Sequence, residues 1–85
     1  MYVHIHMLHD SNDFETITHE FDTFDEAVAS ADRNLMRNLR FIQTTEGYSE
    51  ISVKRFCNPE LETYDAFLSF VDPDGDAVSY SELVV

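Results

Sequence analysis

The sequence predicts an α+β fold, an antiparallel sheet of four to five strands with one amphipathic helix packed on one face in the order ββαβββ. Three observations predict this class. Apolar and polar residues alternate in segments on both sides of a stretch with helical spacing, which spans roughly residues 24–39. Clusters of Asn, Asp, Gly and Pro separate these segments, as turns do. With 85 residues, we expect a single domain over residues 1–85.

Two strands are expected first, at residues 2–8 and 14–21, because each segment alternates with the period of two of a half-buried strand. The intervening stretch DSND at residues 10–13 has turn chemistry, since Asn and Asp both tolerate positive φ. The two segments are therefore predicted to form a hairpin.

The register of this hairpin depends on the length of its loop. A three-residue loop at 11–13 sets Val3 opposite Phe21 and collects the apolar residues on one face. A two-residue loop would set His6 opposite Ile17 and mix apolar and polar residues on both faces. We therefore expect the three-residue loop, which turns the even-numbered residues of the first strand to the solvent.

A capping box is predicted to begin the helix, with Thr23 accepting from the first free backbone N–H groups while Glu26 reaches back. The apolar residues that follow have helical spacing. They are Phe24, Ala27, Val28, Ala31, Leu35 and Leu39. We expect a helix over roughly 24–39, with Phe41-Ile42 forming either its last turn or the start of a short strand.

Three further strands are expected after the helix. Residues 48–56 alternate, although neither face is cleanly apolar, and an Asn-Pro pair ends this strand. Residues 64–71 and 77–84 flank the stretch DPDGD at 72–76, whose Pro-Asp-Gly favours a type I turn followed by a positive-φ Gly. These two segments are predicted to form a second hairpin.

The composition predicts a cytoplasmic protein. Cys57 is the single cysteine, so no internal disulfide can form, which fits a reducing compartment. The N-terminal MYVHIHML lacks the basic region of a signal peptide. No apolar run approaches the ~18 residues that a membrane span needs.

The net charge of −12 is distributed in blocks. Residues 1–32 hold eight carboxylates and no Lys or Arg, residues 33–40 hold three Arg and no acid, and residues 41–85 hold nine carboxylates with Lys54 and Arg55. So acidic a chain lacks the cations that neutralise phosphates, and we expect no binding to nucleic acid or to anionic membranes. The sign of the charge favours a basic protein surface as the partner.

No catalytic signature is present. The sequence has no Gly-rich phosphate loop, no Ser–His–Asp spacing and no CxxC pair, and we predict no enzymatic activity and no cofactor. Asp72, Asp74 and Asp76 resemble the opening of a calcium loop, but Gly75 stands at the fourth position, where an EF-hand has its Gly at the sixth. A hairpin turn explains these acids better.

His4 and His6 share one face of the first strand, and the expected register places Glu20 opposite His4. Two imidazoles and a carboxylate match an open zinc site in kind. The alternative, which we favour, is that both histidines occupy the solvent face of the strand. A small metal- or ligand-binding domain that uses these three residues stays as an alternative function.

Arg33, Arg37 and Arg40 follow i, i+4 and i+7, so they share one face of the expected helix. One interpretation is that they compensate the negative end of the helix dipole and pair with surrounding acids. The other is contact with an acidic patch on a partner, or with a second copy of the chain in a structural homodimer.

The carboxylates are the expected contact groups for a basic partner. Twelve net charges equal only ~20 Å of duplex at ~1.7 Å per charge, while a domain of this size is ~30 Å across. The density therefore matches DNA only if the charges concentrate on one side. The expected contact residues, with Tyr64 as an aromatic anchor, are Asp10, Asp13, Glu15, Glu20, Glu60, Glu62, Asp72, Asp74 and Asp76.

The helix start T-F-D-E-A-V-x-x-A at 23–31 and the strand S-V-K-R-F at 52–56 are similar in layout to a small phage-encoded inhibitor of bacterial RNA polymerase. More loosely, a small acidic α+β domain without catalytic residues resembles phage-encoded inhibitors in general, anti-CRISPR proteins included. The resemblance implies a nucleic-acid mimic in the host cytoplasm and assigns no residue a role. We therefore expect a non-enzymatic inhibitor, monomer or homodimer, that occupies a basic nucleic-acid-binding surface.

Overall fold

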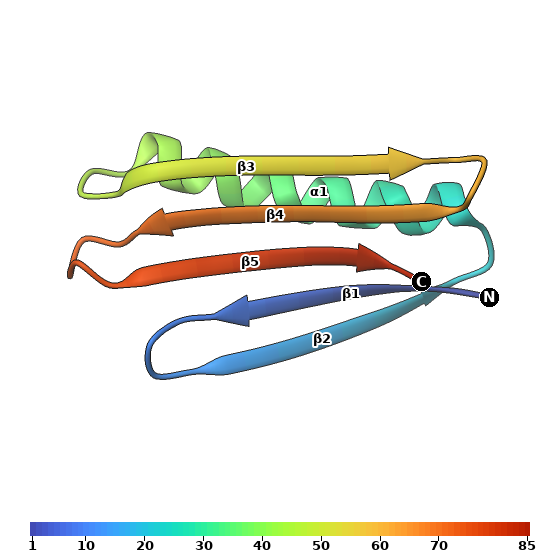
Figure 1. Cartoon of the computed structure of the whole chain (residues 1–85), viewed down its shortest axis with the longest axis horizontal. Helices are drawn as coiled ribbons and strands as arrows, with labels where there is room; N and C mark the ends of the chain where they lie inside the picture. Colours follow the sequence, from blue (N-terminus) through green and yellow to red (C-terminus); the bar gives the residue numbers. More distant parts are fainter.

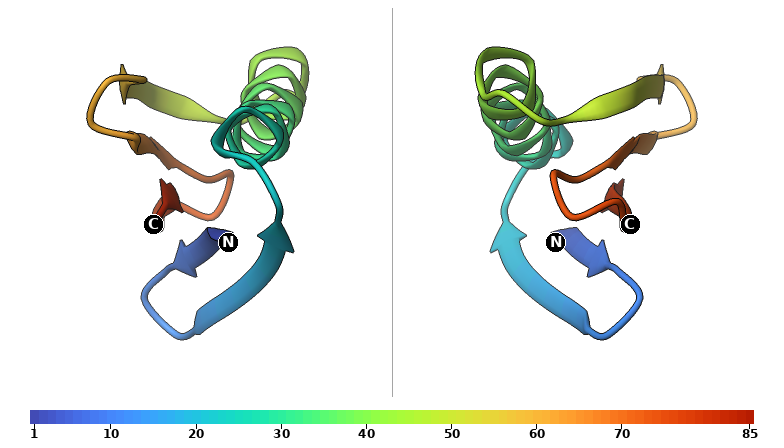
Figure 2. Two further views of the ribbon diagram at one scale, coloured as in Figure 1. Left: turned by 90° about the vertical axis from the view of Figure 1, so that its right-hand side faces the viewer. Right: turned by 90° about the vertical axis from the view of Figure 1, so that its left-hand side faces the viewer.

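The computed structural model describes residues 1–85 and shows the predicted α+β class, one helix with a five-stranded antiparallel sheet in the order ββαβββ (Figure 1). The elements are β1 (Tyr2–His9), β2 (Phe14–Phe21), α1 (Phe24–Thr44), β3 (Ser49–Asn58), β4 (Thr63–Val71) and β5 (Ala77–Val84). The strands lie side by side in the order β2-β1-β5-β4-β3. The end-on views in Figure 2 show that the sheet curls and that α1 lies on its concave side. The helix lacks the apolar stretch that crossing a bilayer requires.

The core lies between α1 and the concave face of the sheet. Buried and exposed residues alternate along β4 from Tyr64 to Phe70, which is the pattern of a strand with one covered face. From α1, Ala27 and Ala31 are both 0% exposed. Their small side chains let the helix backbone approach the sheet closely, so this part of the interface is densely packed.

The predicted Thr23 cap forms at the start of α1, and Glu26 reaches back to the Thr23 hydroxyl rather than to its backbone N–H. The Thr23 Oγ1 accepts from the Glu26 backbone N–H at 3.1 Å, and the same hydroxyl donates to the Glu26 carboxylate at 2.9 Å. The helix continues five residues past its predicted end, to Thr44. Ile42 is 3% exposed and joins the core, so Phe41-Ile42 belongs to the end of the helix rather than to a strand.

The register of the first hairpin differs from the prediction. His6 lies opposite Ile17, so the expected three-residue loop at 11–13 is wrong, and residues 10–13 all lie between the paired strands. The even-numbered residues of β1 therefore face α1, and the expectation of solvent-facing histidines is wrong. The physical reason is that His4 and His6 find hydrogen-bond partners in the core, which offsets the cost of burying polar groups.

The second hairpin forms as predicted, with Val71 opposite Ala77 across the β4–β5 loop. Inside that loop the Asp72 N–H donates to the Asp76 carbonyl at 2.9 Å, and Gly75 has a φ of +88°. The predicted strand before it is β3, which lies at the edge of the sheet with almost all of its residues exposed. This exposure explains why neither face of β3 is apolar in sequence.

Candidate functional site

The acidic residues gather at the two ends of the elongated molecule, which measures 39 × 22 × 17 Å. At one end three loops meet, residues 10–13, 45–48 and 72–76, on the left of Figure 1. The loops at 45–48 and 72–76 touch, since a Cβ added to Gly47 would stand 3.0 Å from the side chain of Pro73, and Asp10 of the first loop lines one pocket together with Asp72. This region is the loop end. Its eight carboxylates are Asp10, Asp13, Glu15, Glu46, Glu50, Asp72, Asp74 and Asp76.

The opposite end holds both chain termini, the β3–β4 turn and the start of α1 (Figure 1). This region is the termini end. Its six carboxylates are Glu20, Asp22, Asp25, Glu26, Glu60 and Glu62. The rest of the molecule carries all five Lys and Arg residues and the three remaining acids, and Arg40, next to Phe41 near the end of α1, lies nearest the loop end. The blocks of charge in the sequence thus become two acidic ends and a mixed middle.

The structure divides the nine predicted contact carboxylates between the two ends. Asp10, Asp13, Glu15, Asp72, Asp74 and Asp76 lie at the loop end, and Glu20, Glu60 and Glu62 lie at the termini end. They do not share one surface. Tyr64, the predicted aromatic anchor, is 2% exposed because it lies on the face of β4 that packs against α1. The prediction of Tyr64 as an exposed anchor is therefore wrong.

Arg33, Arg37 and Arg40 share an exposed face of α1, as predicted, and line a shallow depression with Met36 and Phe41. None of the three arginines forms an ion pair. The last turn of α1 lies beyond them and holds no basic residue. The interpretation as dipole compensation with ion pairing is therefore wrong, and contact with a partner or a second copy stays a prediction.

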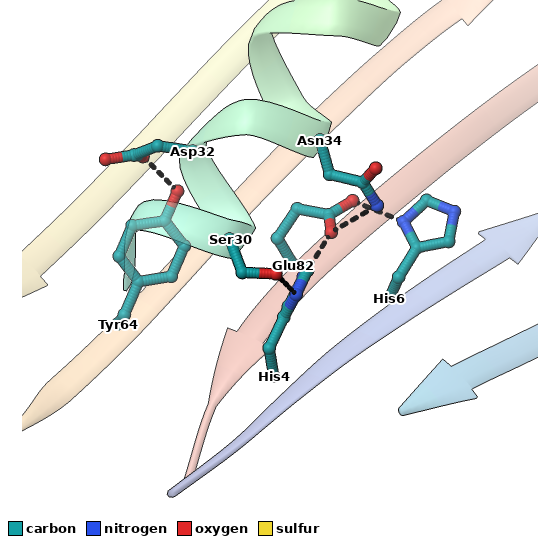
Figure 3. A network of polar contacts seen from close by, with 7 residues as sticks. All are labelled: His4, His6, Ser30, Asp32, Asn34, Tyr64 and Glu82. Atoms are coloured by element: carbon teal, nitrogen blue, oxygen red, sulfur yellow. Dashed lines mark hydrogen bonds and ion pairs between the residues drawn. The ribbon is translucent and has the colours of Figure 1, made fainter. Parts of the chain in front are cut away.

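A polar network lies buried between α1, β1 and β5 (Figure 3). Its centre is Glu82, which is 0% exposed. One carboxylate oxygen lies 2.7 Å from His4 Nε2, and the other lies 2.5 Å from His6 Nδ1. From α1, Asn34 donates to Glu82 at 3.2 Å, and the Ser30 hydroxyl lies 2.8 Å from His4 Nδ1. No buried side-chain nitrogen or oxygen lacks a partner, so the network is fully satisfied.

The pKa of Glu82 lies below its ordinary value. Burial raises this pKa by disfavouring the charged form, but the hydrogen bonds from two histidines and Asn34 together outweigh it. The core therefore holds an ionised carboxylate with no Lys or Arg in contact. Because a buried charge is stable only while its donors stay in place, the network fixes β1 against β5 and α1.

The metal site of His4, His6 and Glu20, which the sequence left as an alternative, does not form. Glu20 pairs with Val3, so its side chain lies on the face of the sheet opposite His4. Glu82 takes the place expected for Glu20, yet both of its oxygens bind imidazole nitrogens directly. No group of three or more His, Cys, Asp or Glu side chains is arranged to hold a metal ion. The two histidines are therefore interpreted as structural residues.

Ser30, His4 and Glu82 stand in the order of a Ser–His–carboxylate triad. A nucleophile acts only where a substrate can reach it. His4 and Glu82 are 1% and 0% exposed, and none of the five main surface depressions is lined by any of the three residues. We therefore interpret this arrangement as core hydrogen bonding.

Glu82 is the residue that sequence reasoning missed. In β5 it alternates with Val78, Tyr80 and Val84, so a carboxylate stands in phase with the apolar residues of the strand. That pattern indicates a buried charge and could have identified it. Its histidine partners carry no such local signal, because they lie 76 and 78 positions away in the chain.

The loop end is the candidate site that these observations favour, since its acids are mostly exposed and no Lys or Arg lies in its three loops. The centre of the buried network, by contrast, lines none of the five main surface depressions. Comparisons with protein-family models, with curated proteins and with solved structures found no match. The resemblance to phage-encoded inhibitors therefore stays a prediction.

Proposed function

We propose that the protein is a non-enzymatic binding module whose loop end occupies a basic, nucleic-acid-binding surface of a larger protein or complex. The observation that carries the proposal is the concentration of eight carboxylates in and beside three loops that contain no Lys or Arg. Such binding inhibits the partner, because the occupied surface is closed to nucleic acid.

The charge density of the loop end supports mimicry of a nucleic acid. A DNA duplex carries one charge per ~1.7 Å of its axis, so eight carboxylates equal ~14 Å of duplex. The loop end spans the two short dimensions of the molecule, 22 and 17 Å. The charges at the loop end are thus less dense than on DNA, but denser than the net charge of −12 spread over the 39 Å length of the molecule.

Hydrogen bonds within the loops hold the acidic segments in place. Asp72 Oδ1 accepts from the backbone N–H of Asp74 at 3.0 Å and from that of Asp76 at 2.9 Å. Asp10 Oδ1 accepts from the Asn12 N–H at 2.8 Å. Because these bonds restrict two of the three loops before binding, less conformational entropy is lost when a partner docks.

The test compares two triple variants that change the net charge equally. The loop-end triple is Glu46→Gln, Asp74→Asn and Asp76→Asn, and the termini-end triple is Glu20→Gln, Asp22→Asn and Glu60→Gln. None of these six side chains forms an ion pair or a hydrogen bond within the protein. Both triples should therefore fold like the wild type.

Each protein serves as bait for a lysate of the source cells, and the bound proteins are challenged with salt and with duplex DNA. We expect the wild type and the termini-end triple to retain a basic nucleic-acid-binding protein, which salt releases by screening and DNA releases by competition. The loop-end triple should bind it at least about tenfold more weakly, at ~0.5 kcal/mol for each exposed charge. Equal retention by the two triples, or resistance to salt and DNA, contradicts the proposal.

A structural homodimer is the second candidate function, and the edges of the sheet favour it. β2 and β3 are both edge strands, and the ten-residue β3 has exposed apolar side chains at Ile51, Val53 and Phe56. An unpaired strand edge is a template for pairing with another chain. Light scattering at two protein concentrations tests this candidate. A mass that doubles as concentration rises supports it, and a monomer mass at both concentrations contradicts it.

A further inference from the structure

A pocket at the loop end lies between the last part of α1 and the neighbouring ends of β4 and β5. Its volume is about 210 Å³. Four aromatic rings and two carboxylates give the pocket its chemical character. They are Phe41, Tyr48, Phe70, Tyr80, Asp10 and Asp72. This aromatic pocket is smaller than the ~300–1,000 Å³ of sites for drug-sized ligands, so its size suits a single side chain.

The aromatic rings form one continuous wall. The ring centroids of Phe41 and Tyr48 are 5.8 Å apart, those of Tyr48 and Phe70 are 5.5 Å apart, and those of Phe70 and Tyr80 are 5.7 Å apart. The first two pairs meet edge to face, at 73° and 62°. Aromatic pairs at these distances stabilise one another, and the face of an aromatic ring attracts a cation.

The charged groups that line the aromatic pocket are all negative. Asp10 and Asp72 each use Oδ1 to accept from backbone N–H groups of their loops, which leaves the second oxygen without a protein partner. Neither of them pairs with a Lys or Arg. The last turn of α1, which also contributes to the wall, carries the negative end of the helix dipole and holds no basic residue.

Two hydroxyl groups add neutral acceptors to this surface. Tyr48 and Tyr80 are half-buried and belong to the wall, and their hydroxyls make no hydrogen bond within the protein. Burial first, and then the neighbouring Tyr48 and Asp10, raise the pKa of Tyr80, so its hydroxyl keeps its proton. A hydroxyl oxygen can accept from an ammonium or a guanidinium group.

We propose that the aromatic pocket receives one Lys or Arg side chain of a basic partner. The inference rests on the proposed function, which it extends from general charge contact to one defined anchor. The aromatic faces attract the cation, the free carboxylate oxygens accept charge-assisted hydrogen bonds, and the apolar lining covers the aliphatic stem. The negative lining disfavours an anion in the same position.

The probe is a deca-arginine peptide, and the matched control is a deca-citrulline peptide, which has a similar shape and no charge. We expect deca-arginine to bind and to move the NMR signals of the Tyr48 and Tyr80 rings. Deca-citrulline should leave both signals unchanged. The ring of Phe14, which lies at the loop end outside the pocket, should shift much less than either tyrosine with both peptides.

Two variants remove parts of the wall. Phe41→Ala deletes a ring that is 56% exposed, and Tyr48→Leu keeps an apolar side chain without a ring. Phe14→Ala is the control, because it deletes a ring that is 60% exposed at the same end. We expect each pocket variant to bind deca-arginine about three- to tenfold more weakly and the control to bind like the wild type. Melting curves show whether each variant is folded.

Two outcomes overturn the inference. One is equal weakening by Phe14→Ala and by the pocket variants, and the other is binding that leaves the Tyr48 and Tyr80 signals unmoved. If the loop-end triple weakens binding of deca-arginine while Phe41→Ala does not, the anchor is wrong and the proposed function stands. If the pocket binds deca-arginine but the loop-end triple captures the same proteins as the wild type, the cation site stands and the proposed function is wrong.

Discussion

Two carboxylates, Glu82 on β5 and Asp32 on α1, are held in different ways (Figure 3). Glu82 is buried and is bound by two histidines and an asparagine, with no Lys or Arg in contact. The side chain of Asp32 is 34% exposed and accepts from the Arg55 guanidinium twice at 2.8 Å and from the Tyr64 hydroxyl at 2.6 Å. Water shares the charge of Asp32, whereas the charge of Glu82 depends entirely on protein donors. We therefore expect the buried Glu82 to contribute more to the free energy of unfolding than the exposed carboxylates do.

Removal of Glu82 should lower the free energy of unfolding more than any other change considered below. Glu82→Leu keeps a similar volume but leaves His4 and His6 buried without their acceptor. Because breaking a buried charge network costs about 3–5 kcal/mol, we expect a loss of that size in the free energy of unfolding, measured by urea denaturation. The control Asp65→Asn removes an exposed carboxylate from β4 and should change the free energy of unfolding by less than ~0.5 kcal/mol. A loss below ~1 kcal/mol for Glu82→Leu would show that the buried network contributes little.

Acid should weaken the same network, because the pKa of Glu82 in the folded protein lies below its ordinary value of 4.5. With a lowered pKa, the stabilisation is fully present above pH 4.5 and is lost as the pH falls through the folded-state pKa. We expect the melting temperature of the wild type to fall more steeply in this range than that of Glu82→Gln, which has no carboxylate to protonate. Parallel curves for the two proteins would contradict this expectation.

Tyr64 links the buried core to the partly exposed Asp32, since its ring lies in the core and its hydroxyl donates to Asp32. Tyr64→Phe keeps the ring and removes a hydrogen bond to a charged acceptor, so we expect a loss of about 1–2 kcal/mol in the free energy of unfolding. The pKa of Asp32 should also rise. Arg55 is the main cause of its lowered pKa, and the Tyr64 hydroxyl contributes to it as well. An NMR titration of Asp32 that is the same in both proteins would count against this hydrogen bond.

The parts of the fold that the sequence predicts correctly depend on neighbouring residues. The cap of Thr23 and Glu26 forms where expected, and so does the turn at 72–76 between the last two strands. In both places the backbone preference of a few adjacent residues decides the structure. At the end of the helix, by contrast, the sequence of Phe41-Ile42 fits a last helical turn or the start of a strand, and in the structure Ile42 is helical and buried in the core.

The first hairpin shows what local patterns leave open. Alternation within the hairpin favours Val3 and Ile5 as the buried residues of β1, and His4 and His6 as the exposed ones. The acceptor that reverses this choice is Glu82, which the chain supplies more than seventy positions later. A register that depends on a distant hydrogen bond cannot be derived from alternation within the hairpin.

The candidate site was predictable only in part, for the same reason. The sequence predicts six of the loop-end carboxylates as contacts. That Glu46 and Glu50 lie at the same end depends on how the loops meet in the fold. The sequence also does not distinguish Tyr64, which is buried, from Tyr48, which lines the aromatic pocket. The side to which each tyrosine points follows from strand register and loop position.

Loss of the exposed ion pair between Asp32 and Arg55 should change the free energy of unfolding least. The side chains of Arg55 and Asp32 are 43% and 34% exposed, and exposed ion pairs contribute only ~0.2–1 kcal/mol. Arg55 also lies over the Tyr64 ring, 5.2 Å from its centroid, and Arg55→Met keeps most of that apolar contact. We therefore expect a loss of at most about 1 kcal/mol in the free energy of unfolding, which shrinks in added salt because ions screen the pair. The loss in Glu82→Leu should not respond to salt, since the buried network is shielded from ions. A large, salt-independent loss for Arg55→Met would show that both carboxylates are held in the same way.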